Sequence, residues 1–313
     1  MPRDSKTQDV IIDVADWTYD AMFGSYPEGA RSKDALFPPD PTLFPYIIPK
    51  RRYLYKRSDR RYPDQFWGEV VAYQVGCLLD VTVPPAFAAK NSQLGDCGAL
   101  IEWFYEDGKA TFTPGGSYMQ KLMPEFDRKK GELHNFQYVE ILCNVYSRAH
   151  IIEEPWIDSW ADMFLFDALI GNTDRHQDNW GFIRAKGHSR WTIAPLFDNG
   201  TSLGHERFEQ QVQAWSTSKF ESYVSKGTHH IRMRKGDPKG CSHVELLQDL
   251  CIRYPVIKER MLNKVRQFNI DALSRVLEFY CDLQINIPLT AFRKDFYLRL
   301  IDFRRNKILA ALQ

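Results

Sequence analysis

The stretch GNTDRHQDNWGFIRAKGHSRWTIAPLFDNG, residues 171–200, decides how the rest of this chain is interpreted. It opens with Asp174, His176 and Asn179 inside six residues, and it closes with Asp198 after a short apolar run. Phosphoryl transfer uses such groups: one carboxylate orients or deprotonates a hydroxyl, while an Asn and a second carboxylate hold magnesium against nucleotide phosphates. We therefore predict Asp174 as a catalytic base and Asn179 and Asp198 as magnesium ligands.

Each of these residues also has a simpler interpretation. Asp174 could cap a helix terminus, and Asp198 could be a turn aspartate before Asn199-Gly200. His176 is predicted either to contact phosphate or to support the loop as a buried histidine bonded to a backbone carbonyl. Asp178 is expected to face solvent.

The residues before the motif predict a rigid helix that delivers it. Within 156–169, Trp160, Phe164 and Ala168 recur at i, i+4 spacing, which is typical of a buried helix face. Gly171 suits the position just after a helix end, where the backbone turns left-handed. The Asp-containing loop is therefore expected to follow a buried helix directly.

The second half of the motif predicts a β-hairpin. Residues 181–185 and 190–197 are both typical of strands, and the four residues between them contain a glycine. A hairpin here would bring Asp198 back toward Asn179.

The remainder of the C-terminal half is predicted to be helical, apart from one basic segment. The segment KGTHHIRMRKGDPKG, residues 226–240, has no interleaved aromatic residues, so we expect a solvated loop. An acidic partner or a nucleic acid is the alternative. The predicted helices cover residues 136–149, 242–253, 255–283 with a break near Asn269, and 289–311.

Two segments of the N-terminal half contain groups that could bind phosphate. The segment GSYPEGARSKDALFPP, residues 24–39, combines flexible glycines with Arg31 and Lys33, although an ordinary surface turn fits this composition better. Residues 51–56 alternate like a half-buried strand that ends in Lys56, and an amphipathic helix with Glu69 near its start is predicted over 64–81.

The spacing of Lys56 and Glu69 allows two interpretations. Kinases pair a strand lysine with a helix glutamate, but on spacing alone two solvated charges are favoured here. Residues 99–105, ALIEWFY, predict a short apolar strand, followed by a turn at Asp107-Gly108. This strand is either a plain buried strand or one that leads into a hinge facing an adenine ring.

Composition excludes several classes of protein. Of the 313 residues, 44% are hydrophobic and 26% charged, and the formal net charge is +1, so the chain as a whole has no pull toward nucleic acid or membrane. No apolar run approaches the ~20 residues that span a bilayer, and no secretory signal is evident. The six cysteines are widely spaced, which predicts reduced thiols and a cytoplasmic protein. Because the net charge is close to zero, we expect no direct nucleic-acid binding.

The central motif resembles the catalytic and metal-binding motifs of the HipA-like protein Ser/Thr kinases. Asn172 to Asn179 match the pattern N-x-D-x-H-x-x-N, and Pro195 to Asp198 match P-x-x-D. The core D-R-H-x-x-N also looks like the catalytic loop of phosphatidylinositol kinases, so the motif indicates phosphoryl transfer more firmly than it indicates the acceptor.

The resemblance extends over most of the chain in collinear order and assigns further residues. Lys56 and Glu69 fall at the strand lysine and the helix acid that hold the nucleotide, and Glu102 and Phe104 flank the adenine in the hinge. Asn179 and Asp198 would hold the metal, and His176 and Asn179 would assist Asp174 at the nucleotide. The G-x-x-x-K phosphate loop falls on Gly29, Ala30, Arg31, Ser32 and Lys33.

The resemblance implies an α+β, two-lobed, protein-kinase-like fold. A small strand-rich N-lobe would cover residues 1–104, and a helical C-lobe residues 105–313. It further implies ATP and Mg²⁺ as cofactors and a protein Ser/Thr substrate. It also implies a toxin or effector role, restrained by a small DNA-binding antitoxin, and autophosphorylation at Ser25 or Ser32. A lipid or small-molecule kinase, and a catalytically silent binding module, are the competing interpretations.

Three departures from the family pattern stand out. Only about 28 residues precede Gly29, so the chain resembles the shorter HipA-like proteins that lack an extra N-terminal subdomain. Asp80-Val81 replaces the usual glycine turn after the 64–81 helix, and Asn199-Gly200 follows Asp198, so an Asp-Phe-Gly sequence is absent.

Overall fold

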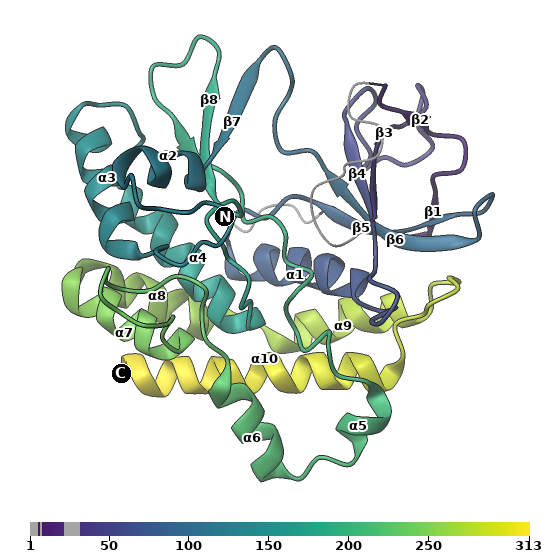
Figure 1. Ribbon diagram of the computed structural model, residues 1–313. Helices are drawn as coiled ribbons and strands as arrows, with labels where there is room; N and C mark the ends of the chain where they lie inside the picture. The colour runs from purple at the N-terminus through teal and green to yellow at the C-terminus, as the bar shows by residue number, and fades with distance from the viewer. Residues whose placement is uncertain (1–5, 7, 22–31) are drawn as a thin grey trace. The chain divides into compact units, whose positions relative to one another are not determined.

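The computed structural model describes residues 6, 8–21 and 32–313 (Figure 1). The candidate loop residues Gly29, Ala30 and Arg31, and Ser25, lie outside the described residues. The fold is α+β, as predicted, with one six-stranded and one three-stranded sheet among the described residues.

The chain divides into two compact units, and both are discontinuous. The first comprises residues 1–106, 199–214 and 269–299, and the second comprises 107–198, 215–268 and 300–313. The first segment ends two residues beyond the expected lobe boundary, but the first unit also takes two later segments that had been assigned to the C-lobe. The division into lobes at 104/105 itself stays a prediction.

The first unit is built on a six-stranded sheet in the order β1-β5-β6-β4-β3-β2. Only the β1–β5 pair is parallel. The strand predicted at 51–56 is confirmed as β4, while the one predicted at 99–105 is shifted toward the N-terminus as β6. The strands are β1 Ile12–Asp13, β2 Thr18–Tyr19, β3 Lys33–Phe37, β4 Tyr53–Arg57, β5 Ala86–Asn91 and β6 Asp96–Glu102.

The predicted helix over 64–81 is confirmed as α1 (Phe66–Leu79), but it is not amphipathic. Twelve of its 14 residues are buried, because it packs against β5 and β6 and also against α9 (Ile270–Cys281). Polar groups on it are satisfied inside this unit: Trp67 Nε1 donates to Ile287 O at 3.0 Å. The helix ends at Asp80 in the left-handed conformation, φ 56°, at the place where the family pattern has a glycine turn.

The second unit combines helices with the antiparallel sheet β7-β8-β9. Helix α4 contacts α7 and α8, and α2 lies beside the antiparallel strands β7 and β8 (Figure 1). The predicted break at Asn269 is confirmed, because this residue caps α9 with its side chain. The elements of this unit are β7 Ala110–Pro114, α2 Gly115–Leu122, α3 Phe136–Arg148, α4 Trp156–Ile170, β8 Gly181–Ala185, β9 Thr192–Ile193, α6 Thr217–Lys226, α7 His243–Arg253 and α8 Val256–Gln267.

Two remaining helices belong wholly or partly to the first unit. Helix α5 spans Glu209–Gln213, and α10, which spans Ala291–Leu312, contributes residues to both units. All six cysteines are free thiols, three of them buried and three half-buried. Within the described part of the chain, no helix combines the length and apolarity needed to cross a bilayer.

The strand predicted over 190–197 was too long. The β8–β9 pairing stops at Phe182↔Ile193, and Ala194 N–H makes one further bond, to Gly181 O at 2.9 Å. Beyond that point Phe197 O accepts a hydrogen bond from the Arg175 side chain rather than from a neighbouring strand. The chain therefore leaves the sheet four residues before Asp198.

The expectation of a solvated loop at 226–240 was only partly right: residues 234–236, 238 and 239 are exposed, but part of the segment before them is buried. His229, Ile231 and Met233 alternate with more exposed neighbours and are at most 4% exposed. The backbone of this segment forms a bridge between Arg232 and Asn135. Its alternating pattern, once the basic residues are set aside, is that of a chain buried on one face.

Candidate active site

Helix α4 ends in a glycine that no other residue can replace without strain. Gly171 has φ 66°, and a Cβ on it would lie 2.0 Å from Cζ of the buried Arg304. Left-handed backbone and close packing thus both require glycine here. The residue that follows, Asn172, is held back on the helix by a bond from its N–H to Asp167 O at 2.9 Å.

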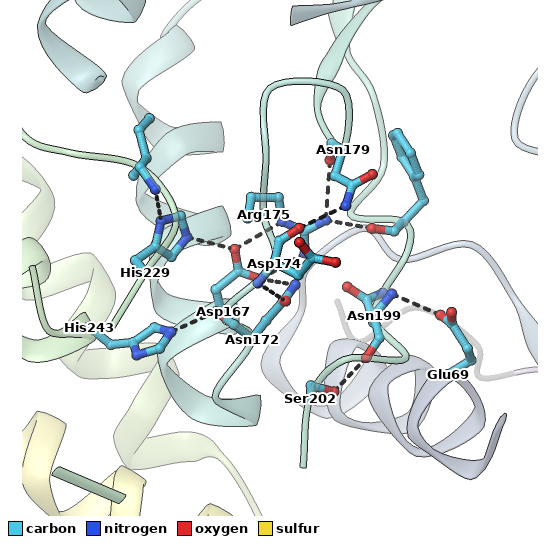
Figure 2. Close-up of polar contacts among 12 residues, drawn as sticks. Glu69, Asp167, Asn172, Asp174, Arg175, Asn179, Asn199, Ser202, His229 and His243 are labelled. Atoms are coloured by element: carbon cyan, nitrogen blue, oxygen red, sulfur yellow. Dashed lines mark hydrogen bonds and ion pairs between the residues drawn. The ribbon is translucent and has the colours of Figure 1, made fainter. Parts of the chain in front are cut away.

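The carboxylate of Asp167 is the centre of a fully buried polar network (Figure 2). Arg175 donates to it twice, from Nη2 to Oδ1 at 2.7 Å and from Nε to Oδ2 at 2.9 Å. Asn172 Nδ2 donates to Oδ1 at 3.2 Å, and His229 Nε2 donates to Oδ2 at 3.0 Å. Burial alone would raise the pKa of Asp167, but the Arg175 guanidinium and the His229 hydrogen bond outweigh it and hold this pKa below its usual range.

The tautomer of His229 follows from its two partners. Ile231 N–H donates to Nδ1 at 3.1 Å, so the ring proton is on Nε2, which faces Asp167. The imidazole is therefore neutral, and the charge of the carboxylate is balanced by the guanidinium of Arg175.

Arg175 connects this network to the backbone at and beside the candidate metal ligands. Its Nη1 donates to the carbonyls of Asn179, at 3.2 Å, and of Phe197. The loop with the candidate base and the residue just before Asp198 are thereby held by one guanidinium (Figure 2). Asp167 and Arg175 are absent from the sequence-based assignments, although a lone aspartate in the apolar run FLFDALI was a usable signal.

Asp174 is held through its backbone, and its side chain is half-buried. Its N–H donates to Asn172 Oδ1 at 3.0 Å, and its carbonyl accepts from Asn179 Nδ2 at 2.8 Å. Asn172 is in turn held by His243, whose Nε2 donates to Asn172 O at 2.7 Å. The geometry thus presents the Asp174 carboxyl on a loop whose backbone is fixed on both sides (Figure 2).

Asn179 and Asp198 have the oxygen donors that a hard divalent cation takes. Because Asn179 Nδ2 is bonded to Asp174 O, its Oδ1 is directed elsewhere, and no described residue donates to it. Asp198 adopts φ 57°, an uncommon conformation for a non-glycine residue. The described residues contain no cluster of three His, Cys, Asp or Glu suited to a metal. A two-residue oxygen set fits Mg²⁺, which usually binds one or two carboxylates together with substrate phosphates.

One interpretation expected the His176 ring to bond a backbone carbonyl. It has no such bond to any described residue. Its Nδ1 accepts the Asp178 N–H at 3.2 Å, and its ring is half-buried and 6.1 Å from that of His230. Asp178, expected to face solvent, is half-buried and paired with Arg128 Nε at 2.9 Å.

Lys56 and Glu69 are not the solvated charges that spacing alone favoured. They form an ion pair at 2.8 Å, and their side chains are 5% and 3% exposed. The second oxygen of Glu69 accepts the backbone N–H of Asn199 at 2.9 Å, and Ser202 Oγ donates to Asn199 O at 2.6 Å (Figure 2). The first unit therefore joins the candidate phosphate lysine to the residue that follows Asp198.

The register of the sheet brings a second lysine to the same face as Lys56. Lys33 in β3 lies directly opposite Lys56 in β4, and residues opposite one another in an antiparallel pair share a face. Ser32, next to it, accepts a hydrogen bond from Arg57 Nη1 at 3.2 Å. These are the two members of the expected phosphate loop that the structure describes.

The predicted hinge residues lie at the end of β6. Glu102 Oε2 accepts from Lys6 Nζ at 2.6 Å, and its N–H donates to Pro85 O at 2.8 Å. Phe104 stacks edge-on against Tyr105, with ring centroids 5.4 Å apart. The Glu102 N–H is thus already committed to a backbone partner, and the adenine-flanking role of Glu102 and Phe104 stays a prediction.

Known proteins resemble this chain both in sequence and in fold. The chain is 55% identical over 166 residues to the serine/threonine-protein kinase CtkA of Helicobacter pylori strain J99, a match covering 47% of this chain and 43% of that protein. The chain thus spans less than half the length of the curated relative it matches.

Solved structures extend the similarity of fold to nearly the whole chain. The crystal structure of a Helicobacter pylori proinflammatory kinase CtkA superposes with a TM-score of 0.74 and 18% identity, covering 96% of both chains. The 18% identity is counted over a structural superposition that covers 96% of both chains. The 55% identity is counted over a sequence alignment of 166 residues. A Shewanella oneidensis MR-1 HipA, HipB and operator DNA complex matches with a TM-score of 0.49 and 12% identity, over 94% of this chain and 66% of that one.

The sequence itself matches a described family over more than half of its length. Residues 28–240, which contain the strand lysine, the catalytic loop and the metal motif, match the HipA-like C-terminal domain. This chain belongs to the HipA-like C-terminal domain family.

Proposed function

We propose that this protein is an ATP-dependent kinase that phosphorylates Ser or Thr residues of a protein substrate. One observation carries the proposal: Arg175, fixed by Asp167, binds the carbonyls of both Asn179 and Phe197. The candidate base and the two candidate metal ligands thereby belong to one preorganised network. Preorganised charge and position are what phosphoryl transfer requires of a protein, since the group that moves needs little covalent assistance.

In the proposed step, the hydroxyl oxygen of the substrate attacks the γ-phosphorus of ATP. The bond from that phosphorus to the β–γ bridging oxygen breaks, ADP leaves, and the hydroxyl proton passes to Asp174. Asn179 Oδ1 and the Asp198 carboxylate would hold Mg²⁺, which when bound neutralises charge on the phosphates. Lys56, oriented by Glu69, would hold the phosphates of the nucleotide.

The name of the relative found by sequence supports the proposed kinase activity. CtkA of Helicobacter pylori is named a serine/threonine-protein kinase, and the family match includes every motif assigned above except the C-terminal helices. Because the alignment covers 43% of that protein, its activity is carried to this chain as a proposal. A restraining DNA-binding antitoxin, a toxin role and a cytoplasmic location stay predictions from the family resemblance.

The direct test is transfer of labelled phosphate from ATP with Mg²⁺, read by electrophoresis of the chain itself and of an added lysate. We expect label with the wild type and a loss of at least about 100-fold in Asp174→Ala and Asp198→Ala. The matched control is Asp295→Asn, which removes a carboxylate that is 72% exposed. Label that persists in both alanine variants would place the chemistry on other residues. A parallel reaction replaces the lysate with lipid vesicles, and label that appears only in the lipid would favour the lipid-kinase alternative.

A further inference from the structure

A chain of hydrogen bonds beside the catalytic loop runs in one direction. The indole Nε1 of Trp180, the residue after Asn179, can only donate, and it donates to His134 Nε2 at 3.0 Å. The proton of the neutral His134 ring is therefore on Nδ1, which lies 3.3 Å from His230 Nδ1. His230 must accept there, so its own proton is on Nε2. His134 is fully buried and Trp180 is 1% exposed, so no other arrangement of these protons satisfies both rings.

This hydrogen-bond chain ends in donors that have no acceptor among the residues that the structure describes. Neither His230 Nε2 nor the Nε2 of the nearby His176, whose Nδ1 accepts the Asp178 N–H, is bonded to any residue that the structure describes. The half-buried guanidinium of Arg232 also has no carboxylate or carbonyl partner among those residues, although its backbone is bonded to His134 and Phe136. Burial, together with the nearby His176 and Arg232, lowers the pKa of His230 to about 4, so it stays a neutral donor.

Further cations lie on two segments, the one that carries His230 and Arg232 and the one that leads to His134. Lys129 and Lys130 precede His134, and Arg234 follows Arg232. All three are exposed, and among the described residues no carboxylate forms an ion pair with their side chains. Other charges here are already paired, Arg128 with Asp178 at 2.9 Å and Lys235 with Glu125 at 2.9 Å. Asp127 caps the N–H groups of residues 129 and 130, and Glu132 is the other exposed carboxylate of this segment.

From this geometry we infer that His176, His230 and Arg232 form a recognition site for an acidic side chain of the protein substrate, next to the phosphorylated Ser or Thr. This inference rests on the proposed function, and it adds a substrate class: an acceptor within an acidic segment. A polypeptide fits better than a compact anion, because exposed cations lie on two segments, at Lys129 and Lys130 on one and at Arg234 on the other. The three donors would contact one carboxylate, and Lys129, Lys130 and Arg234 would attract its acidic neighbours.

Two peptides test the inference in a kinase assay: a serine flanked by glutamates, and the same peptide with glutamines. We expect wild-type kcat/KM to be at least about tenfold higher for the glutamate peptide. In Arg232→Gln this ratio should fall to within about twofold of one. Lys226→Gln, which removes an exposed cation at the end of α6 outside the proposed site, should keep the wild-type ratio. Equal kcat/KM for the two peptides in the wild type would overturn the inference while leaving the kinase proposal intact.

A binding measurement separates this inference from the function on which it rests. Fluorescence anisotropy of the labelled glutamate peptide needs no ATP, and we expect Arg232→Gln to weaken binding about tenfold. Peptide binding that depends on Arg232, without phosphate transfer to any acceptor, would support the site and contradict the kinase proposal. Binding of a single-stranded RNA that Arg232→Gln abolishes, with no binding of the peptide, would overturn the inference in favour of a nucleic-acid surface.

Discussion

Helices α1 and α4 are built alike but are used differently. Both are almost entirely buried, and each carries one buried carboxylate, Glu69 or Asp167, that pairs with a cation. Asp167 accepts four hydrogen bonds, two of them from a planar guanidinium, so its partner is held in a fixed orientation. Glu69 accepts one bond from Lys56 and one from a backbone N–H.

The difference predicts that the Asp167–Arg175 pair supports the fold and that the Lys56–Glu69 pair acts on the nucleotide. A lysine is a compact charge with three rotatable donors, so Lys56 can keep its bond to Glu69 while its ammonium group turns toward a phosphate. The arginine in the other pair has its donors occupied by Asp167 and by two carbonyls, and it is 1% exposed. We therefore expect loss of Asp167 to affect folding first, and loss of Lys56 to affect phosphate transfer first.

The largest effect on stability is expected from Asp167→Ala. It leaves the Arg175 charge buried without its partner, so the free energy of unfolding should fall by about 3–5 kcal/mol. Urea denaturation followed by circular dichroism measures this. The control on the same helix is Asp158→Ala, which removes a half-exposed carboxylate 3.8 Å from Arg260 and should cost less than about 1 kcal/mol. Similar losses in the two variants would contradict the central place given to Asp167.

Acidification should weaken the same network through His243. Burial and the nearby His229 lower the pKa of His243 to about 4, despite the opposing effect of its bond to Asn172 O. Below about pH 6.5 the unfolded chain therefore takes up a proton at this residue that the folded chain refuses until about pH 4. Stability is thus fully present above this window and is lost as the pH falls through it.

Between pH 7.5 and pH 5 the contribution of His243 amounts to about 2 kcal/mol. Urea titrations of the wild type and His243→Gln at both pH values measure it, since glutamine can still donate to Asn172 O but does not titrate. The pH-induced loss should be smaller in the variant by that amount. Equal losses would mean that His243 charges as readily in the folded protein as in the unfolded chain.

Lys56→Met is expected to spare the fold and impair the reaction. Glu69 keeps its Asn199 partner, so the free energy of unfolding should fall by only about 1–3 kcal/mol. Phosphate transfer should fall by about 100-fold, and the rise in melting temperature that ATP with Mg²⁺ produces in the wild type should shrink. Lys50→Met, at a lysine whose side chain is 82% exposed, is the matched control. Full activity in Lys56→Met would remove this lysine from the nucleotide site.

The smallest effect concerns the ends of the two helices. At the end of α4, the Arg304 side chain occupies the space that a Cβ on Gly171 would take. At the end of α1, Asp80 is an exposed non-glycine residue at φ 56°. Asp80→Gly removes the penalty of that conformation and should stabilise the protein by about 0.5 kcal/mol. Thermal unfolding of Asp80→Gly beside Asp80→Ala checks this, and a destabilised glycine variant would show that the Asp80 side chain outweighs backbone strain.

Local patterns in the sequence were sufficient for much of the secondary structure. The helix 156–169 and its glycine stop were found within one residue, because i, i+4 apolar spacing and a C-terminal glycine are local signals. Strand β7 and helix α2 are absent from the predicted elements, because two consecutive glycines, Gly115 and Gly116, are typical of a loop. Those glycines are needed for a non-local reason: Trp180 and Asp178 occupy the space that their Cβ atoms would take.

The sequence by itself determined the family and the α+β class, and it supplied Asp174, Asn179 and Asp198 as candidate site residues, because a motif is a property of residue order. Tertiary structure alone decided that Lys56 and Glu69 are buried together, that Asp167 holds Arg175, and that His229 reaches that carboxylate from 62 residues away. Charge and burial depend on which distant segments pack together. No spacing along a single chain encodes that packing.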